Sequence, residues 1–417
     1  MIRIFHELIQ SYPTWPLLEE FLESEAGGGF RVIDSSEDGL SLIRYEKDVT
    51  DMSRPHSKWF RSVVWDREAH RPVCMAPPKS AADAPPFLTW QEAAEAGGLV
   101  CQEWLEGFMI NVVRRAGEDT VRIVSRSRLD ASGRFYSKKT FEQLFMEAYL
   151  GTTVEPDEPL TALRQEVTAR FPCPDPSKGE RAVFVSFMVH HPEHRVVQLH
   201  TEARVWGIHQ GVVDEEGVVS CVDSPSSPHW NALTSIPHPE EGDIASWMKT
   251  QQNACPWNIQ GFVLKDTHGN RWKYPCAEYA TVHSLRGNTP YGIDRFMMLY
   301  LQRLVPLYLQ YYPEDTDAFR FHSEQMLRLT EWIHLQYRQL HVLRSTTLGN
   351  IDKMFHSHLY ALHGMYLTHF RDKKKKLTCN DVYDYLMKQP WPRIVFLLRR
   401  WEDSYLEGVR QESASVA

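Results

Sequence analysis

Residues suited to phosphate or metal chemistry stand in the segment 99–113, LVCQEWLEGFMINVV. Glu106 and Gly107 separate two apolar runs, which we interpret as two short buried strands folded back at an acidic turn. Glycine allows a ligand to approach the backbone closely, as a nucleotide or metal pocket requires. On pattern alone an ordinary hairpin is favoured over such a pocket, so the neighbouring segments must decide.

Basic residues alternate in the following segment, VRIVSRSRL. We expect a strand with Arg122, Arg126 and Arg128 on one side, because alternate residues of a strand share a face. The fork of a guanidinium matches phosphate oxygens, so the strand is interpreted either as a phosphate contact or as a solvated edge.

A second basic group, Lys265, Arg271 and Lys273, surrounds the turn THGN of a predicted hairpin. Without further context these are charged residues beside a surface turn. In the C-terminal part, His356, His358, His363 and His369 lack the i, i+4 spacing of a helical metal site, so we predict no metal ligands there. The lysines 373–376 form a solvated turn or contact a phosphate backbone.

Charge and composition limit the classes of function. Lys plus Arg number 46 and Asp plus Glu 54, a net charge of -8, so a general polyanion binder is disfavoured and nucleic-acid binding needs a local basic surface. Hydrophobic residues make up 42%, enough for real cores in two or three domains. The 7 cysteines contain no Cys-x-x-Cys pair, which argues against a disulfide framework or zinc ribbon and favours a reducing compartment. With no signal peptide and no spanning segment, we expect a cytoplasmic protein without a membrane partner.

The periodicity predicts an α+β protein. Two short helices interrupted by Pro13 and Pro16 precede four strands in an antiparallel meander over residues 30–77. Helices at 90–96, 140–150, 160–170 and 243–252 then alternate with hairpins. Composition changes after residue 288, and we expect an antiparallel-sheet domain over 1–288 and an all-α domain over 289–417, with helices at 291–311, 319–344, 348–370, 378–388 and 393–406.

Five fragments, taken in order, resemble motifs of one protein family. They are Phe60-Arg61-Ser62-Val63, Leu105-Glu106-Gly107, His191-Pro192-Glu193-His194-Arg195-Val196-Val197, Gln260-Gly261-Phe262-Val263 and Arg271-Trp272-Lys273. Their order, with helices behind them, resembles the phage-type single-strand RNA ligases and the related predicted RNA ligase-like proteins of large DNA viruses, within the covalent nucleotidyltransferase superfamily.

The resemblance implies an ATP-grasp-like ligase domain that joins or adenylylates RNA ends with ATP and Mg²⁺, in contact with nucleotide and RNA. In that family a lysine amine attacks the α-phosphate of ATP, and AMP passes from the lysine to an RNA 5′-phosphate. Carried over to this chain, the resemblance implies catalytic roles for Lys79, Lys265 and Lys273, with Glu106 directed towards the ribose. The implied phosphate-side cations are Arg61, Arg126, Lys265, Arg271 and Lys273. The implied nucleotide-binding residues are Arg61, Trp104, Glu106, Gly107, Arg126, Gln260 and Arg271.

Three positions depart from the family pattern. Trp104 stands where the family has its nucleophilic lysine, and Met188 and Gln260 stand where it has acids, so no strong Mg²⁺ ligand is implied at Gln260. We take Lys79, in the rigid PPKS loop, as the candidate relocated lysine, with a phosphate contact or a surface lysine as the competing interpretations. The alternatives are a ligase-fold module that only binds nucleotide or RNA ends, an mRNA-capping-type guanylyltransferase, disfavoured by the helical C-terminal part, and an unrelated α+β protein.

Overall fold

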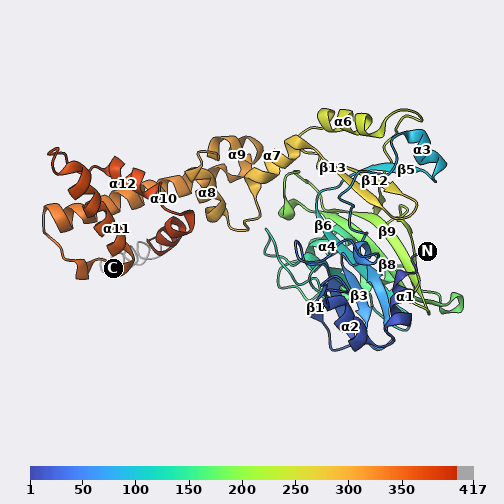
Figure 1. Ribbon diagram of the computed structural model, residues 1–417. Coiled ribbons are helices and arrows are strands. Elements are labelled where there is room, and N and C mark those ends of the chain that lie inside the picture. Colours follow the sequence, from blue (N-terminus) through green and yellow to red (C-terminus); the bar gives the residue numbers. More distant parts are fainter. Residues whose placement is uncertain (402–417) are drawn as a thin grey trace. The chain divides into compact units, whose positions relative to one another are not determined.

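The computed structural model describes residues 1–401, and its N-terminal part is a four-stranded antiparallel meander beside two helices. The sheet order is β1-β2-β3-β4, as predicted. Phe5, Leu18, Phe60 and Trp65 are buried in its core. The elements are α1 (Ile4–Ser11), α2 (Trp15–Glu23), β1 (Arg31–Ser35), β2 (Leu40–Arg44), β3 (Val63–Asp66) and β4 (Arg71–Met75) (Figure 1).

The largest sheet has the order β10-β9-β8-β6-β7, with β11 (Asn231–Ala232) added in parallel beside β9. Its strands are β6 (Phe108–Arg115), β7 (Arg122–Ser125), β8 (Glu180–His190), β9 (Arg204–Asp214) and β10 (Val219–Asp223). Helices α4 (Phe141–Leu150) and α5 (Thr161–Arg170) bury apolar side chains with one face of this sheet, while Phe184 and Val213 join the core of the meander. The predicted N-cap of α4 is confirmed, since Thr140 Oγ1 accepts the Gln143 N–H at 3.2 Å.

A third sheet, with the order β13-β12-β5, unites distant parts of the chain. It contains β5 (Leu99–Glu103), β12 (Gly261–Asp266) and β13 (Arg271–Pro275), with α3 (Trp90–Glu95) and α6 (Ile244–Ala254) in its connections. The predicted hairpin of β12 and β13 is confirmed. The hairpin predicted for residues 99–113 is wrong, because β5 pairs with β12 and β6 pairs with β7 and β8. Residues 104–107 therefore carry the chain from one sheet to another.

Gly107 is the residue that this crossing requires. Its φ is +137°, and a Cβ there would lie 2.4 Å from the carbonyl oxygen of Val189. Any side chain would therefore push β6 away from the end of β8.

The single arginine face predicted for residues 121–129 is also wrong. Strand β7 ends at Ser125, where the side-chain oxygen of Ser125 accepts the Arg128 N–H at 3.1 Å in a tight turn. Arg122 pairs with Asp38, whereas Arg126 donates to the hydroxyl of Tyr45 at 3.0 Å. The alternation of basic residues that suggests a strand therefore extends to Arg128, beyond the last residue of β7.

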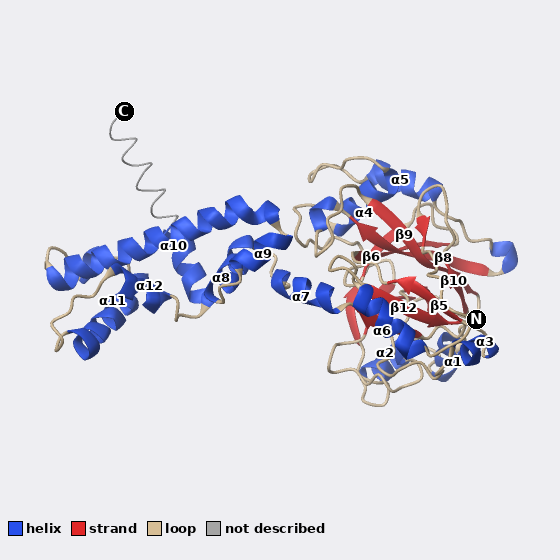
Figure 2. Cartoon of the chain, turned by 90° about the horizontal axis from the view of Figure 1, so that it is seen from above, coloured by secondary structure: helices blue, strands red, loops and turns tan. Residues whose placement is uncertain are grey.

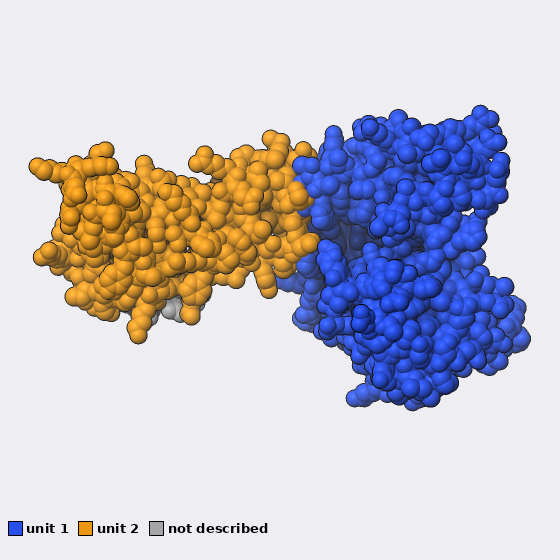
Figure 3. Space-filling view, in the orientation of Figure 1, with its two compact units in different colours: residues 1–283 blue, residues 284–417 orange. Residues whose placement is uncertain are grey.

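Residue contacts divide the chain into two units between His283 and Ser284, within α7 (Ala277–Arg286) (Figure 3). The described part of the second unit is built from helices (Figure 2). They are α8 (Gly292–Leu301), α9 (Val305–Tyr311), α10 (Thr316–Tyr337), α11 (Lys353–Met365) and α12 (Cys379–Leu386), followed by helical residues 391–401. The part of the predicted helix 393–406 after residue 401 lies outside the described residues.

Two findings bear on the expected compartment. A disulfide joins Cys255, after α6, to Cys276, after β13, although the sequence predicted no disulfide framework. The two cysteines are brought together because the β12–β13 hairpin returns the chain to the end of α6. Among residues 1–401, no helix combines the length and the apolar character needed to cross a bilayer.

Candidate functional site

Five basic side chains gather where β13 faces the large sheet: Arg61, Lys79, Arg126, Arg271 and Lys273, hereafter the cation cluster. Each of the other four acts electrostatically on Lys273. Arg271 and Lys273 stand two positions apart on β13 and so share a face. Within residues 1–401, none of the five forms an ion pair with a carboxylate. The site thus concentrates positive charge without a carboxylate in direct contact, although Asp223 acts electrostatically on Arg271.

Lys273 is the most perturbed amine of the cation cluster. Its Nζ lies 3.8 Å from the ring centroid of Trp104, the residue that the sequence resemblance aligns with a lysine of the ligases. Burial, followed by the repulsion of the neighbouring cations, lowers the pKa of Lys273 to about 7. A substantial fraction of this amine is therefore unprotonated at neutral pH, the state in which an amine is nucleophilic.

The guanidinium groups are buried with incomplete hydrogen bonding. Arg271 Nε and Nη1 have no partner in the described part of the chain, and neither does Arg126 Nε. Burial lowers the pKa of Arg61 and of Arg271 to about 10, so both remain charged at neutral pH. Buried charged donors are costly unless an anion accepts their hydrogen bonds. This pattern is typical of a site for phosphate oxygens.

Tyr45, which the sequence did not single out, organises one side of the cation cluster. Lys79 Nζ lies 5.1 Å from its ring centroid and Arg126 Cζ lies 5.2 Å from it. The ring thus holds two cations near each other through cation–π contacts. Its position just after β2 carries no sequence signal for such a role.

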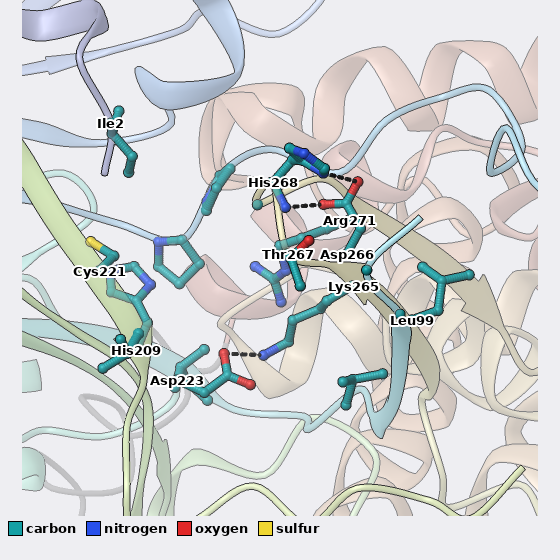
Figure 4. A pocket seen from close by; sticks show the side chains of 18 of the residues that line it. Ile2, Leu99, His209, Cys221, Asp223, Lys265, Asp266, Thr267, His268 and Arg271 are labelled. Atoms are coloured by element: carbon teal, nitrogen blue, oxygen red, sulfur yellow. Dashed lines mark hydrogen bonds and ion pairs between the residues drawn. The ribbon is translucent and has the colours of Figure 1, made fainter. Parts of the chain in front are cut away.

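Lys265 lies next to the cation cluster but is neutralised by a partner. It pairs across β12 and β13 with Arg271, and its Nζ forms an ion pair with Asp223 Oδ1 at 2.8 Å (Figure 4). Gln102 Nε2 donates to the other carboxylate oxygen of Asp223 at 3.2 Å. Burial lowers the pKa of Lys265, and the carboxylate opposes that shift. The structure therefore separates Lys265 from the unpaired cations.

Glu106 has a role within the protein that the sequence did not indicate. Its buried carboxylate accepts the N–H groups of Val197 and Gln198, each at 3.0 Å, and the hydroxyl of Tyr279 at 2.7 Å. These donors occupy the carboxylate that the resemblance directs towards a ribose. Glu106 thus anchors the segment after β8 to the crossing between the sheets.

The residues in the gap between the sheets do not fit a Mg²⁺ ion. Met188 lines the gap and is uncharged, and so is Gln260, which directly precedes β12 and does not line the gap. The one carboxylate that lines the gap belongs to Glu103, whose pKa is raised by burial. Elsewhere in residues 1–401, Glu147, His191 and Glu193 place ligand-type atoms within 4.8 Å of one another. Lys139 Nζ already donates to both carboxylates there, at 2.8 Å each. The ammonium group of Lys139 thus neutralises these carboxylates in the way that a bound metal ion would.

The gap between the sheets is small. Trp104, Met109 and Met188 fill it beside Arg61 and Lys273, and the remaining cavity measures about 30 Å³. That volume accommodates a water molecule and not a nucleobase. In this conformation the cation cluster can receive phosphate oxygens, but the gap cannot receive a whole nucleotide.

Comparison with known proteins gives no match to a family model and none to a curated protein. Among solved structures, the chain is similar to an archaeal ATP-dependent RNA ligase, with 10% identity, a TM-score of 0.32 and coverage of 76% of this chain and 77% of that chain. It is also similar to a putative ATP-dependent DNA ligase from Aquifex aeolicus, with 11% identity, a TM-score of 0.34 and coverage of 85% and 80%. At these TM-scores the assignment of function rests on the residues of the site.

Proposed function

We propose that the chain is a nucleotidyltransferase of the RNA-ligase type in which Lys273 carries the nucleotide. The observation that supports this proposal is the buried amine of Lys273, with its pKa lowered to about 7, among four further cations that lack carboxylate partners. An amine of this kind beside unpaired guanidinium groups suits attack on a phosphate.

The proposed first step follows from the chemistry of the amine. The free amine of Lys273 attacks the α-phosphorus of ATP, a P–N bond forms, and the P–O bond to pyrophosphate breaks. The nitrogen loses one proton to solvent, and pyrophosphate leaves with the electron pair of the broken bond. Arg61 and Arg271 hold the phosphate oxygens and stabilise the charge that develops on them.

The later steps transfer the nucleotide to RNA. A 5′-phosphate oxygen of an RNA end attacks the phosphorus of the lysine-bound AMP, and the P–N bond breaks as the lysine nitrogen takes up a proton. A 3′-hydroxyl then attacks the activated 5′-phosphate, which releases AMP and a proton. Arg126 and Lys79, held on Tyr45, are the proposed contacts to the second phosphate.

Lys273 is preferred over Lys79 and Lys265 as the nucleophile for geometric reasons. Its amine lies 3.8 Å from the ring centroid of Trp104. Trp104 is the residue that the sequence resemblance aligns with the lysine of the ligases. Lys265 is paired with Asp223, and Lys79 faces Tyr45. In the proposal Lys265 therefore keeps its expected role as a phosphate-side cation, Lys79 joins it, and Lys273 takes the place of Lys79 as the candidate nucleophile.

A second function, binding without chemistry, is favoured by one observation. The gap of about 30 Å³ is filled by Trp104 and two methionines, so ATP cannot enter it in this conformation. In this alternative the cation cluster holds the terminal phosphate of a nucleotide or an RNA end, and no lysine is modified.

Incubation with ATP and Mg²⁺, followed by intact-mass and peptide mass spectrometry, separates the two functions. The first proposal predicts an added AMP on the peptide that contains Lys273, lost in Lys273→Ala and retained in the matched variant Lys265→Ala. If ATP or a 5′-phosphorylated RNA binds but no lysine carries an adduct, the first proposal is wrong and the second function, binding without chemistry, is supported. An adduct from GTP and none from ATP indicates a capping-type enzyme, and separate ligation assays with RNA and DNA define the nucleic acid.

A further inference from the structure

A large cavity adjoins the cation cluster on the side away from Trp104. Its volume is about 640 Å³, and Arg271 and Ile208 line both this cavity and the small gap between the sheets. We call it the outer cavity, and Figure 4 shows its side chains. The volume falls in the range of pockets that bind small ligands and cofactors.

Flat and apolar groups form part of the wall of the outer cavity. Trp59, Pro77, Pro78, Leu99 and Ile208 contribute to this surface. The backbone at Gly98, with a φ of +94°, also lines it, and a Cβ there would meet no atom within 4 Å. Aromatic and apolar walls of this kind accept the face of a nucleobase.

Polar groups from two different sheets line the outer cavity. His209 and Asp223 come from the large sheet, and Lys265 and Arg271 come from the small one (Figure 4). His209 Nε2 lies 3.0 Å from the carbonyl oxygen of Met75, so this nitrogen carries the proton and Nδ1 is an acceptor. The carboxylate of Asp223 is fixed by Lys265 and Gln102. The Nδ1 acceptor of His209 and the second lone pair on each carboxylate oxygen of Asp223 match ribose hydroxyls and the amino groups of bases.

Arg271 connects the outer cavity to the reactive amine. It stands on the same face of β13 as Lys273, and its Nε and Nη1 are buried without a hydrogen-bond partner in the described chain. A phosphate bound to this guanidinium is within the electrostatic reach of Lys273. A nucleoside attached to that phosphate has room in the outer cavity and none in the 30 Å³ gap.

We propose that the outer cavity binds the base and ribose of a nucleoside phosphate, with the phosphates directed past Arg271 to the cation cluster. This inference rests on the proposed function for the role of the phosphates, and it identifies where the nucleoside lies. It also removes the conflict between Trp104 and nucleotide binding, because the base no longer needs the filled gap.

The test compares ATP with inorganic tripolyphosphate, which has the phosphates and lacks the nucleoside. Val100 lines the outer cavity on β5 and is 38% exposed, so Val100→Trp fills the cavity mouth without disturbing a core. We expect calorimetry to show that this variant binds ATP roughly fivefold or more weakly than the unaltered chain, because stacking of a base contributes at least about that factor. Binding of tripolyphosphate should be unchanged. The matched control Leu88→Trp, at an exposed residue outside the cavity, should leave both affinities unaltered.

Each outcome has a distinct meaning. Unaltered ATP affinity in Val100→Trp overturns the inference while leaving the proposed function in place. If neither ATP nor tripolyphosphate binds to the unaltered chain, the proposed function itself is wrong. If Val100→Trp does not fold, photocrosslinking of 8-azido-ATP to the unaltered chain shows which residues lie beside the base. Labels on residues 59, 77–78 or 208–223 support the inference, and labels on Trp104 or Met188 overturn it.

Discussion

Replacing Lys273 by methionine tests the electrostatic description of the site. The substitution Lys273→Met keeps the length of the side chain and removes its charge and its titration. Because the pKa of Lys273 falls from an ordinary value of 10.5 to about 7, the folded protein disfavours the charged amine. The free energy that corresponds to this difference is about 5 kcal/mol, an upper limit because the surroundings relax around a buried charge.

The sign of the pH dependence follows from proton binding. Between pH 7 and 10.5 the unfolded chain binds a proton at this lysine that the folded chain does not, so the free energy of unfolding rises with pH. The destabilisation by Lys273 is complete below pH 7 and is lost as the pH rises through 10.5. We therefore expect Lys273→Met to increase the free energy of unfolding by a few kcal/mol at pH 6.5 and by much less at pH 9.5.

Urea unfolding of both proteins at the two pH values measures this difference. The matched control is Lys249→Met, an exposed lysine on α6 for which we expect no change with pH. An equal gain from Lys273→Met at pH 6.5 and pH 9.5 would refute the reasoning, since it would mean that the amine is not destabilised by its charge.

Three further predictions concern residues that shape the site. Glu106→Gln should lower the free energy of unfolding by about 1.5–3 kcal/mol, because hydrogen bonds to a buried charge are lost. Urea unfolding measures this change, and an unchanged unfolding midpoint would contradict the prediction. Gly107→Ala should cost about 2 kcal/mol or more in the same assay, whereas Gly292→Ala, where a Cβ meets no atom within 4 Å, should cost nothing. Reduction of the disulfide Cys255–Cys276, which closes a loop of 21 residues, should lower the free energy of unfolding by about 3 kcal/mol. A Cys255→Ser variant that loses further stability on treatment with the same reductant would show that the effect does not come from this disulfide.

Much of the local structure could be predicted from the sequence. Proline and apolar spacing predicted α1 and α2, and alternation with turn residues predicted the meander and the β12–β13 hairpin. These elements depend on neighbours in the chain. The prediction of a hairpin at 99–113 was wrong because β5 pairs with β12, which lies far along the sequence. A local sequence pattern does not indicate such a long-range pairing.

The site was only partly visible in the sequence for the same physical reason. Arg271 and Lys273 could be placed on one face of a strand, since their spacing determines it. The isolation of Lys273 from carboxylates, the pairing of Lys265 with Asp223 and the occupation of Glu106 by backbone N–H groups depend on tertiary contacts. The sequence predicted the residue types of a phosphate site, and the fold determines which of them remain unpaired.

Peptide mapping of the chain after incubation with ATP tests the central claim most directly. We predict a phosphoramide-linked AMP on Lys273 of the unaltered protein, formed faster as the pH rises through about 7, where the amine loses its proton. An adduct on Lys79 or Lys265, or no adduct under conditions in which ATP binds, would contradict the assignment of Lys273 as the nucleophile.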